Sequence, residues 1–182
     1  MSKHNRGVLV AVASLPGNHG IGDFGDSCYK FIDWLHDNKY RYWQVLPLNP
    51  IGPGNSPYMS TCSNAIDLRY ISLDFLKEEG LLDELPNYKS KCTKVNYQKT
   101  LIFKKKYLHK AYLKFLEGNT EGFRKFKTRQ PWVSKYATFE VYKEKNNGKC
   151  WSDWPIEERD YYLNHNNPHK SLLNQVNFKI FI

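Results

Sequence analysis

The first half of the chain alternates short apolar runs with one amphipathic segment. Residues 6–13, Arg-Gly-Val-Leu-Val-Ala-Val-Ala, and residues 42–48, Tyr-Trp-Gln-Val-Leu-Pro-Leu, each predict a buried strand. Between them, residues 26–38 predict a helix capped by Asp26 or Ser27. Its apolar positions repeat at the i, i+3, i+4, i+7 spacing: Cys28, Phe31, Ile32 and Leu35. Strand, helix and strand without a hairpin turn predict a right-handed parallel βαβ unit.

Beyond Pro86 the pattern is helical, which marks a boundary in the chain. We expect helices at 97–117, 120–127 and 132–146, and a final helical segment from about Ser171. Residues 71–76, before this boundary, fit either a strand or the start of a short helix. In the longest expected helix the apolar stripe consists of Leu101, Leu108, Tyr112 and Phe115. The lysines largely off that stripe predict a solvated face: Lys104, Lys106, Lys110 and Lys114.

Charge is distributed unevenly over the 182 residues, whose formal net charge is +9. Residues 1–85 carry 7 basic and 10 acidic side chains, whereas residues 86–182 carry 20 basic and 8 acidic ones. A basic half could bind phosphate backbones. Lysines placed between apolar residues at helical spacing are more typical of a solvated helix face, so nucleic-acid binding is the least favoured function.

Composition excludes several other classes of protein. No run approaches the roughly 18 apolar residues of a membrane span, and the apolar stretch at 8–13 is too short for a secretory leader. We therefore expect a cytoplasmic protein with no membrane partner and without disulfides. The cysteines form no Cys-x-x-Cys pair, and His165 and His169 lack accompanying ligands, so we expect no metal site and no cofactor. These cysteines are Cys28, Cys62, Cys92 and Cys150.

A glycine-rich segment follows the first expected strand. Gly20-Ile-Gly-Asp-Phe-Gly25 matches the G-x-G-x-x-G pattern of dinucleotide-binding loops. The segment begins six residues after the strand, and the second strand ends in Leu46-Pro-Leu-Asn49 without the acidic residue that such sites use. We therefore expect a conformational role, with glycines at positive φ in a long loop.

A second long loop, at residues 49–64, follows the second expected strand and is stiffened by prolines. It carries one aromatic ring, Tyr58, beside short hydrogen-bonding side chains: Asn49, Asn55, Ser56 and Ser60. A ring can cover the C–H face of a sugar while hydroxyl and amide groups bind its polar edge. A packing role for Tyr58, with the polar groups capping turns, fits the residues equally well.

Several motifs together carry a resemblance to a known family. They are Ser14-Leu-Pro-Gly17, Gly20-Ile-Gly-Asp-Phe-Gly25, Tyr42-Trp-Gln-Val-Leu-Pro-Leu48, Ser56-Pro-Tyr58, Trp132-x-x-x-Tyr-Ala-x-Phe139 and Gly148-Lys-x-Trp-x-x-Trp-Pro155. In this order they resemble the N-terminal part of amylomaltases, the 4-α-glucanotransferases (disproportionating enzymes) of the α-amylase superfamily. The resemblance spans residues 6 to about 160.

The resemblance implies an α/β fold, the N-terminal portion of a (β/α)8 TIM barrel with a helical insert subdomain. Residues 1–88 would form the first βα units, residues 89–170 the insert, and residues 171–182 the start of a following helix. A complete barrel needs roughly 250 residues, so we expect it to be incomplete in this chain. The strongly apolar ending at 176–182 is also typical of a chain that stops inside a longer protein.

The resemblance further implies a maltodextrin or starch-type α-1,4-glucan as partner. Ser56 and Tyr58 match its Ser-Pro-Tyr motif and would contact glucose units. Ser14 and Asn49 satisfy the rule that barrel ligands meet the C-terminal ends of strands. The sequence departs from the family pattern at Pro53, Asn55 and Met59. Large aromatic residues usually bury, so we expect core packing for Trp151 and Trp154.

Catalysis by this family retains the anomeric configuration, which needs two carboxyl groups roughly 5–5.5 Å apart. The resemblance places the nucleophilic Asp, the acid/base Glu and a stabilising Asp on later strands, beyond residue 182. No catalytic residue is therefore expected here, and Asp23, Asp26, Asp67 and Asp74 occupy no equivalent position. We expect an N-terminal fragment of a 4-α-glucanotransferase that is inactive alone. The alternative is a non-catalytic maltodextrin-binding module.

Overall fold

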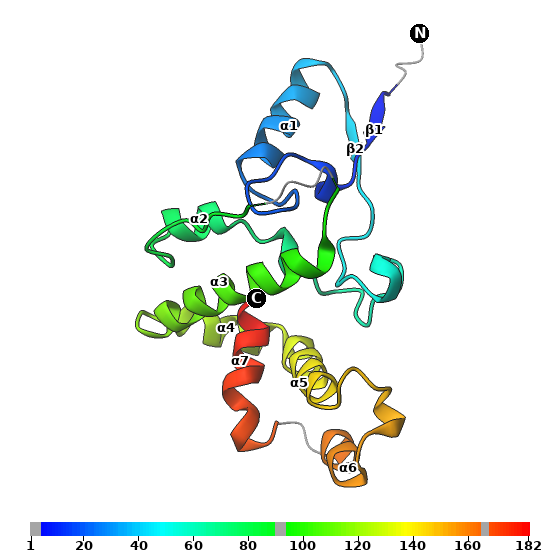
Figure 1. Cartoon of the computed structure of the whole chain (residues 1–182), viewed down its shortest axis with the longest axis vertical. Helices are drawn as coiled ribbons and strands as arrows, with labels where there is room; N and C mark the ends of the chain where they lie inside the picture. Colours follow the sequence, from blue (N-terminus) through cyan, green and yellow to red (C-terminus); the bar gives the residue numbers. More distant parts are fainter. Residues whose placement is uncertain (1–4, 90–93, 165–167) are drawn as a thin grey trace. The chain divides into compact units, whose positions relative to one another are not determined.

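The computed structural model describes residues 5–89, 94–164 and 168–182 (Figure 1). The chain forms two compact units, Met1–Lys114 and Phe115–Ile182. Among the described residues, most of the regular structure is helical and the one sheet has two parallel strands. No helix in this part of the chain combines the length and the apolar character needed to cross a membrane.

The first unit opens with the predicted βαβ arrangement, which is confirmed. Strand β1 (Gly7–Leu9) pairs in parallel with β2 (Tyr42–Gln44), with Gly7 opposite Tyr42. Helix α1 (Asp26–Asp37) connects them and can be followed beside the two strands in Figure 1. Its bounds agree with the predicted helix to one residue, because the apolar spacing fixes where a helix can pack.

The two strands are shorter and more exposed than predicted. Leu9 and Tyr42 are 55% and 59% exposed, so the expectation of buried strands over 6–13 and 42–48 is wrong. Each strand has a single hydrogen-bonded neighbour among the described residues, and the chain after β1 turns into a 3₁₀ helix at Val12–Ser14. The end of the apolar run at 6–13 nevertheless contributes to the core of this unit, where Val12 is buried.

The start of α1 also differs from the prediction. Neither Asp26 nor Ser27 caps it; the N-cap position is Gly25, which offers no side chain. The carboxylate of Asp23 instead accepts the backbone N–H of Gly25, at 3.1 Å. A polar group two residues upstream therefore supports the turn that leads into the helix.

Two further helices complete the first unit. The ambiguous segment at 71–76 forms α2 (Leu73–Glu78), whose N-cap Ser72 accepts from the backbone N–H of Phe75. Helix α3 (Tyr97–Leu116) matches the predicted helix closely. The core near the strands contains buried and half-buried side chains of Val12, Ala13, Ile21, Tyr70, Phe24, Trp43, Val45 and Leu48.

Lys104, expected on a solvated face of α3, is fully buried. Its ammonium nitrogen lies 2.6 Å from Oδ2 of Asp23, 2.6 Å from the carbonyl of Arg69 and 2.8 Å from the carbonyl of Ile71. Periodicity misplaced this lysine because three oxygen partners, on residues remote in sequence, compensate for its lost hydration.

A second buried ion pair lies in the same unit. Nε and Nη2 of Arg69 donate to the two carboxylate oxygens of Asp67 at 2.7 Å and 2.6 Å. Both side chains are almost completely buried. The two-pronged geometry matches guanidinium to carboxylate and orients both groups. Asp23 and Asp67 thus each take part in a buried ion pair of this unit.

The second unit is helical, with α4 (Glu121–Arg129), α5 (Pro131–Lys145), α6 (Ile156–Asn164) and α7 (Leu173–Phe181). The sequence predicted all of these except α6. That helix has no fully buried residue: Ile156 is 65% exposed, and only the adjacent Tyr161 and Tyr162 pack partly against the core, so no repeating apolar stripe marks it. The core of this unit consists of Val133, Ala137, Val141, Tyr142, Trp154, Leu172, Val176 and Ile180.

The two tryptophans of the Trp-x-x-Trp-Pro motif behave differently. Trp154 is buried, and its indole N–H donates to the carbonyl of Lys149 at 3.2 Å. Core packing is therefore confirmed for Trp154. Trp151 is 44% exposed, so the same expectation is wrong for it, because the 3₁₀ turn at Trp151–Asp153 directs only the second ring of the motif into the core.

The buried ammonium gives a direct test of this packing. Replacing Lys104 by Met leaves the Asp23 carboxylate buried without its partner, so we expect the free energy of unfolding to fall by about 3–5 kcal/mol. Urea denaturation followed by circular dichroism measures the change. Lys106→Met on the exposed face of α3 is the control and should change it by no more than about 0.5 kcal/mol. Equal effects of the two variants would contradict the buried network.

Candidate functional site

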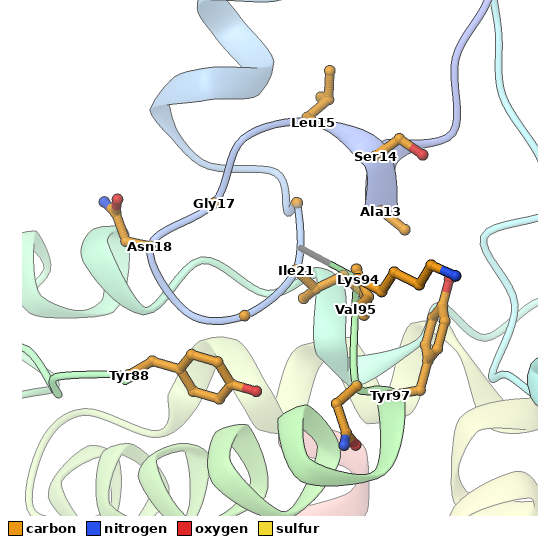
Figure 2. Close-up of a pocket in the computed structure, with 13 residues that line it drawn as sticks. Ala13, Ser14, Leu15, Gly17, Asn18, Ile21, Tyr88, Lys94, Val95 and Tyr97 are labelled. Atoms are coloured by element: carbon orange, nitrogen blue, oxygen red, sulfur yellow. The ribbon is translucent and has the colours of Figure 1, made fainter. Parts of the chain in front are cut away.

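A pocket of about 550 Å³ lies beyond the C-terminal end of β1, within the first unit (Figure 2). One wall is the loop from Ala13 to Gly22, and the other is formed by Tyr88 and by residues 94–97. Figure 2 labels Lys94, Val95 and Tyr97 on this second wall. Two segments far apart in sequence thus enclose this pocket.

The glycines of the loop have two separate roles. Gly20 has a φ of +86°, which confirms the expected left-handed position. Gly22 has no positive φ; a Cβ there would lie 2.1 Å from the carbonyl oxygen of Val12. The expectation of a conformational role is right for Gly20, while Gly22 is needed because the loop packs against its own backbone.

Ser14 is the predicted site residue that this pocket contains. Tyr88 and Tyr97 line it too, and sequence reasoning missed them because neither belongs to a recognisable motif. The Tyr88 hydroxyl lies 3.4 Å from Oγ1 of Thr100, and the guanidinium of Arg69 lies 5.7 Å from the Tyr97 ring centre. Aromatic residues make up 15% of the chain, and this content is the sequence signal that could have indicated such lining groups.

A second pocket, of about 530 Å³, lies beyond the C-terminal end of β2. Residues 45–49 and 63–66 line it together with Tyr58. The structure therefore brings Asn49 and Tyr58 together, as predicted for residues at the end of one strand. Tyr58 is 72% exposed, so the alternative in which its ring packs into the protein is not what the described residues show.

Ser56 supports this pocket without lining it. Its hydroxyl oxygen accepts the backbone N–H of Tyr58 at 3.3 Å, across the intervening proline. Asn49 is also engaged within the loop, because its amide nitrogen faces backbone carbonyls, of which that of Ser63 is 2.7 Å away. Of the four predicted residues, Asn49 and Tyr58 line this pocket, and Tyr58 is the more exposed of the two.

Neither pocket is lined by a carboxylate of the described residues. The nearby acids Asp23 and Asp67 are bound by Lys104 and Arg69. In the described part of the chain, no group of three or more His, Cys, Asp or Glu side chains could hold a metal ion. Cys92 and His165 lie outside the described residues. The two pockets therefore offer binding groups, and among the described residues no carboxylate lines them.

His19 is a buried titratable group beside the first pocket. It is 2% exposed and stacks on Phe103, and among the described residues no group hydrogen-bonds its Nδ1, which lies 3.6 Å from Asp74. Burial lowers the pKa of His19 below its usual value of 6.5, and Lys104 adds to this. Asp74 and Asp23 oppose the shift without overcoming it. The imidazole is thus held neutral.

This buried imidazole makes stability depend on pH. Because the pKa is lower in the folded state, the unfolded chain binds the additional proton, and stability falls as the pH drops below 6.5. We expect the unfolding free energy of the wild type to decrease more between pH 7 and pH 5 than that of His19→Gln. Urea denaturation at both pH values measures it. His36→Gln, on the exposed end of α1, should keep the wild-type dependence; a His19→Gln protein with that same dependence would refute the assignment.

The chain is similar to several known proteins. A family profile described as 4-alpha-glucanotransferase matches residues 10–182. A 4-alpha-glucanotransferase of Streptococcus pneumoniae is 39% identical over 161 residues, which cover 85% of this chain and 32% of that protein. A chloroplastic/amyloplastic 4-alpha-glucanotransferase of Arabidopsis thaliana is 36% identical over 170 residues, covering 89% of this chain and 29% of that protein.

The solved structures include an amylomaltase from Streptococcus agalactiae in complex with acarbose. It superposes with a TM-score of 0.84 at 27% sequence identity, covering 98% of this chain and 38% of that one. The resemblance inferred from the motifs is thereby confirmed. The chain spans about a third of the length of the curated relatives that it matches.

Proposed function

This chain belongs to the 4-alpha-glucanotransferase family, and from that membership we propose that it supplies glucan-binding surface for such an enzyme. The ligand is a maltodextrin or a starch-type α-1,4-glucan. Tyr58 stacks on a glucose ring, Ser56 holds the backbone of Tyr58, and Ser14 offers a hydroxyl in the first pocket. The observation that carries the proposal is the highly exposed Tyr58 in the loop after β2, where it lines the second pocket.

The proposal includes the barrel that the family implies. Strands β1 and β2 would be the first two strands of a (β/α)8 barrel, whose ligands meet the C-terminal ends of the strands. Residues 1–88 then contain the first βα units, residues 89–170 an insert and residues 171–182 the start of a following helix. The parallel pairing of β1 and β2 supports this arrangement, since barrel strands are all parallel.

The chemistry of the second pocket supports a sugar as ligand. Its walls combine the Tyr58 ring with the apolar side chains of Leu46 and Ile66, and Asn64 adds an amide. Apolar surface covers the C–H face of a glucose ring, and the amide and backbone groups bind its hydroxyls. A neutral glucan also matches a site whose lining residues include no charged side chain.

The transfer reaction itself requires groups that these pockets lack. A retaining transfer to the 4-OH of an acceptor sugar needs a carboxylate nucleophile and a carboxyl acid/base. Neither pocket presents a carboxylate among the described residues. The family resemblance assigns both groups to later strands. In this proposal the residues described here bind and orient the glucan, and they do not break its glycosidic bond.

Tyr58→Ala tests the binding role. Loss of the ring removes its stacking on glucose, so we expect maltotriose to bind about tenfold more weakly. Isothermal titration with maltotriose measures the dissociation constant. Tyr58→Phe keeps the ring and should bind within about twofold of the wild type. No binding by the wild type at millimolar maltotriose, or an unchanged Tyr58→Ala, would overturn the proposal.

Incubation with maltotriose tests the catalytic part. The purified 182-residue chain should form no glucose and no longer maltodextrins, because no carboxylate of the described residues lines its pockets. Chromatography of the products after prolonged incubation measures this, with a full-length bacterial relative as positive control. Disproportionation by the chain alone would show that one of its own acids acts in catalysis.

A non-catalytic maltodextrin-binding module is the second candidate, and the same lack of carboxylates in both pockets favours it. It differs from the first in needing no further polypeptide for tight binding. Wild-type affinity equal to that of a full-length relative would favour the module. Much weaker affinity would favour a surface that works together with other parts of the enzyme.

A further inference from the structure

The loop that carries Ser56 and Tyr58 begins and ends at nearly the same place. It leaves β2 through Leu48, and the chain returns at Asp67, whose backbone N–H donates to the carbonyl of Leu48 at 2.9 Å. The intervening residues therefore form a closed loop with a narrow stem. Tyr58 projects from it with 72% of its surface exposed. What holds the stem together decides how firmly that ring is placed.

Asn49 closes the stem from its first residue. Its Nδ2 lies 3.2 Å from the carbonyl of Cys62, 2.7 Å from that of Ser63 and 3.1 Å from that of Ala65. An amide nitrogen has two hydrogens, so three acceptors at these distances occupy its full donor capacity. No donor of Asn49 is left for a sugar; only its amide oxygen could accept from one.

Asp67 closes the stem from the opposite end. Its Oδ2 accepts the backbone N–H of Ile51 at 2.8 Å, while Arg69 fixes the same carboxylate. The loop is compact inside as well, since Gly52 donates to the carbonyl of Ser56 at 3.0 Å. A Cβ on Gly52 would lie 1.9 Å from the carbonyl oxygen of Met59, so the two sides of the loop are in contact.

We propose that Asn49 is a positioning residue, which clamps the 49–66 loop through its three carbonyl contacts and thereby presents the Tyr58 ring to glucan. This inference rests on the proposed function and changes the role of Asn49 from that of a sugar ligand. A loop ordered before the sugar arrives loses less conformational entropy on binding, so the clamp raises affinity without touching the ligand.

Asn49→Asp separates the two roles of this side chain. It keeps the oxygen that could accept from a sugar and replaces the donating nitrogen by a second oxygen. At pH 7.5 the carboxylate faces three carbonyl oxygens and repels them, which opens the stem. At pH 5.0 a carboxyl in these surroundings, whose pKa is raised, takes up a proton and can donate one hydrogen bond again. If Asn49 clamps the loop, maltotriose binding by Asn49→Asp should be weak at pH 7.5 and recover at pH 5.0. If Asn49 instead accepts a hydrogen bond directly from the sugar, the variant should retain binding at pH 7.5.

Hydrogen–deuterium exchange of peptides covering residues 50–64 measures opening of the loop. At pH 7.5 we expect Asn49→Asp to exchange about tenfold faster than the wild type, the effect of losing buried hydrogen bonds. Maltotriose affinity, from isothermal titration, should fall by a similar factor. At pH 5.0 the exchange rate and the maltotriose affinity of Asn49→Asp should both move back toward the wild-type values. The wild type is measured at the same two pH values, so that changes in exchange or affinity that do not arise from residue 49 are subtracted. Asp67 and Cys62 are the other titratable groups next to the stem.

Two further variants complete the design. Asn49→Ala removes the clamp without adding charge and should show the same defects with no recovery at pH 5.0. Asn55→Asp places the same charge at an exposed position of the same loop, and it should match the wild type in exchange. Circular dichroism of each variant establishes that the rest of the chain is folded, so that a global defect is not read as loop opening.

The outcomes distinguish failure of this inference from failure of the proposed function. Unchanged exchange in Asn49→Asp at pH 7.5 would overturn the clamp. Faster exchange in Asn49→Asp with unchanged maltotriose affinity would mean that Asn49 closes the loop but does not position Tyr58 for binding. That result would also overturn the inference. Faster exchange together with no maltotriose binding by the wild type would refute the glucan role of the loop and, with it, the positioning role of Asn49.

Discussion

The ammonium group of Lys104 ties together three segments that are far apart in the sequence. From α3 it reaches Asp23 in the glycine-rich loop and the carbonyls of Arg69 and Ile71 ahead of α2. Removing such a group from water costs several kcal/mol, and good geometry does little more than offset that cost. Its main consequence is therefore specificity of arrangement: only one placement of these segments gives the ammonium its three oxygen partners.

The loops at the ends of both strands depend on that arrangement. Asp23 links Lys104 to the N-terminus of α1 through the backbone N–H of Gly25, and the buried Asp67–Arg69 pair continues into the stem of the second loop through Ile51. Polar groups without such partners would be costly in this interior. Buried ion pairs and their hydrogen bonds thus connect α3 and the start of α1 to the stem of the loop that carries Tyr58.

The sequence predicts the positions of the helices better than it predicts which side chains are buried and what they contact. Apolar spacing located α1, α3 and α5, and it missed α6, which has no buried residue to produce a pattern. It placed Lys104 in solvent because local periodicity does not register Asp23, which is 81 residues away. Motif order identified the family and drew attention to Tyr58. Tyr88 and Tyr97 went unnoticed, since only the folded chain brings them to the glycine-rich loop.

The division of labour between Asn49 and Tyr58 follows from the chemistry of each side chain. A tyrosine ring offers a flat apolar face that needs no backbone partner, so it can project from a loop and remain available to a ligand. An asparagine amide has two N–H donors, which bind to nearby backbone carbonyls and are then unavailable to a ligand. Here three carbonyls of its own loop lie within hydrogen-bonding distance of the Asn49 amide nitrogen. Proximity to a pocket is therefore insufficient to make a polar residue a ligand. Its donors must also be free, and those of Asn49 are engaged by its own loop, which is why the proposed role of Asn49 is to position Tyr58.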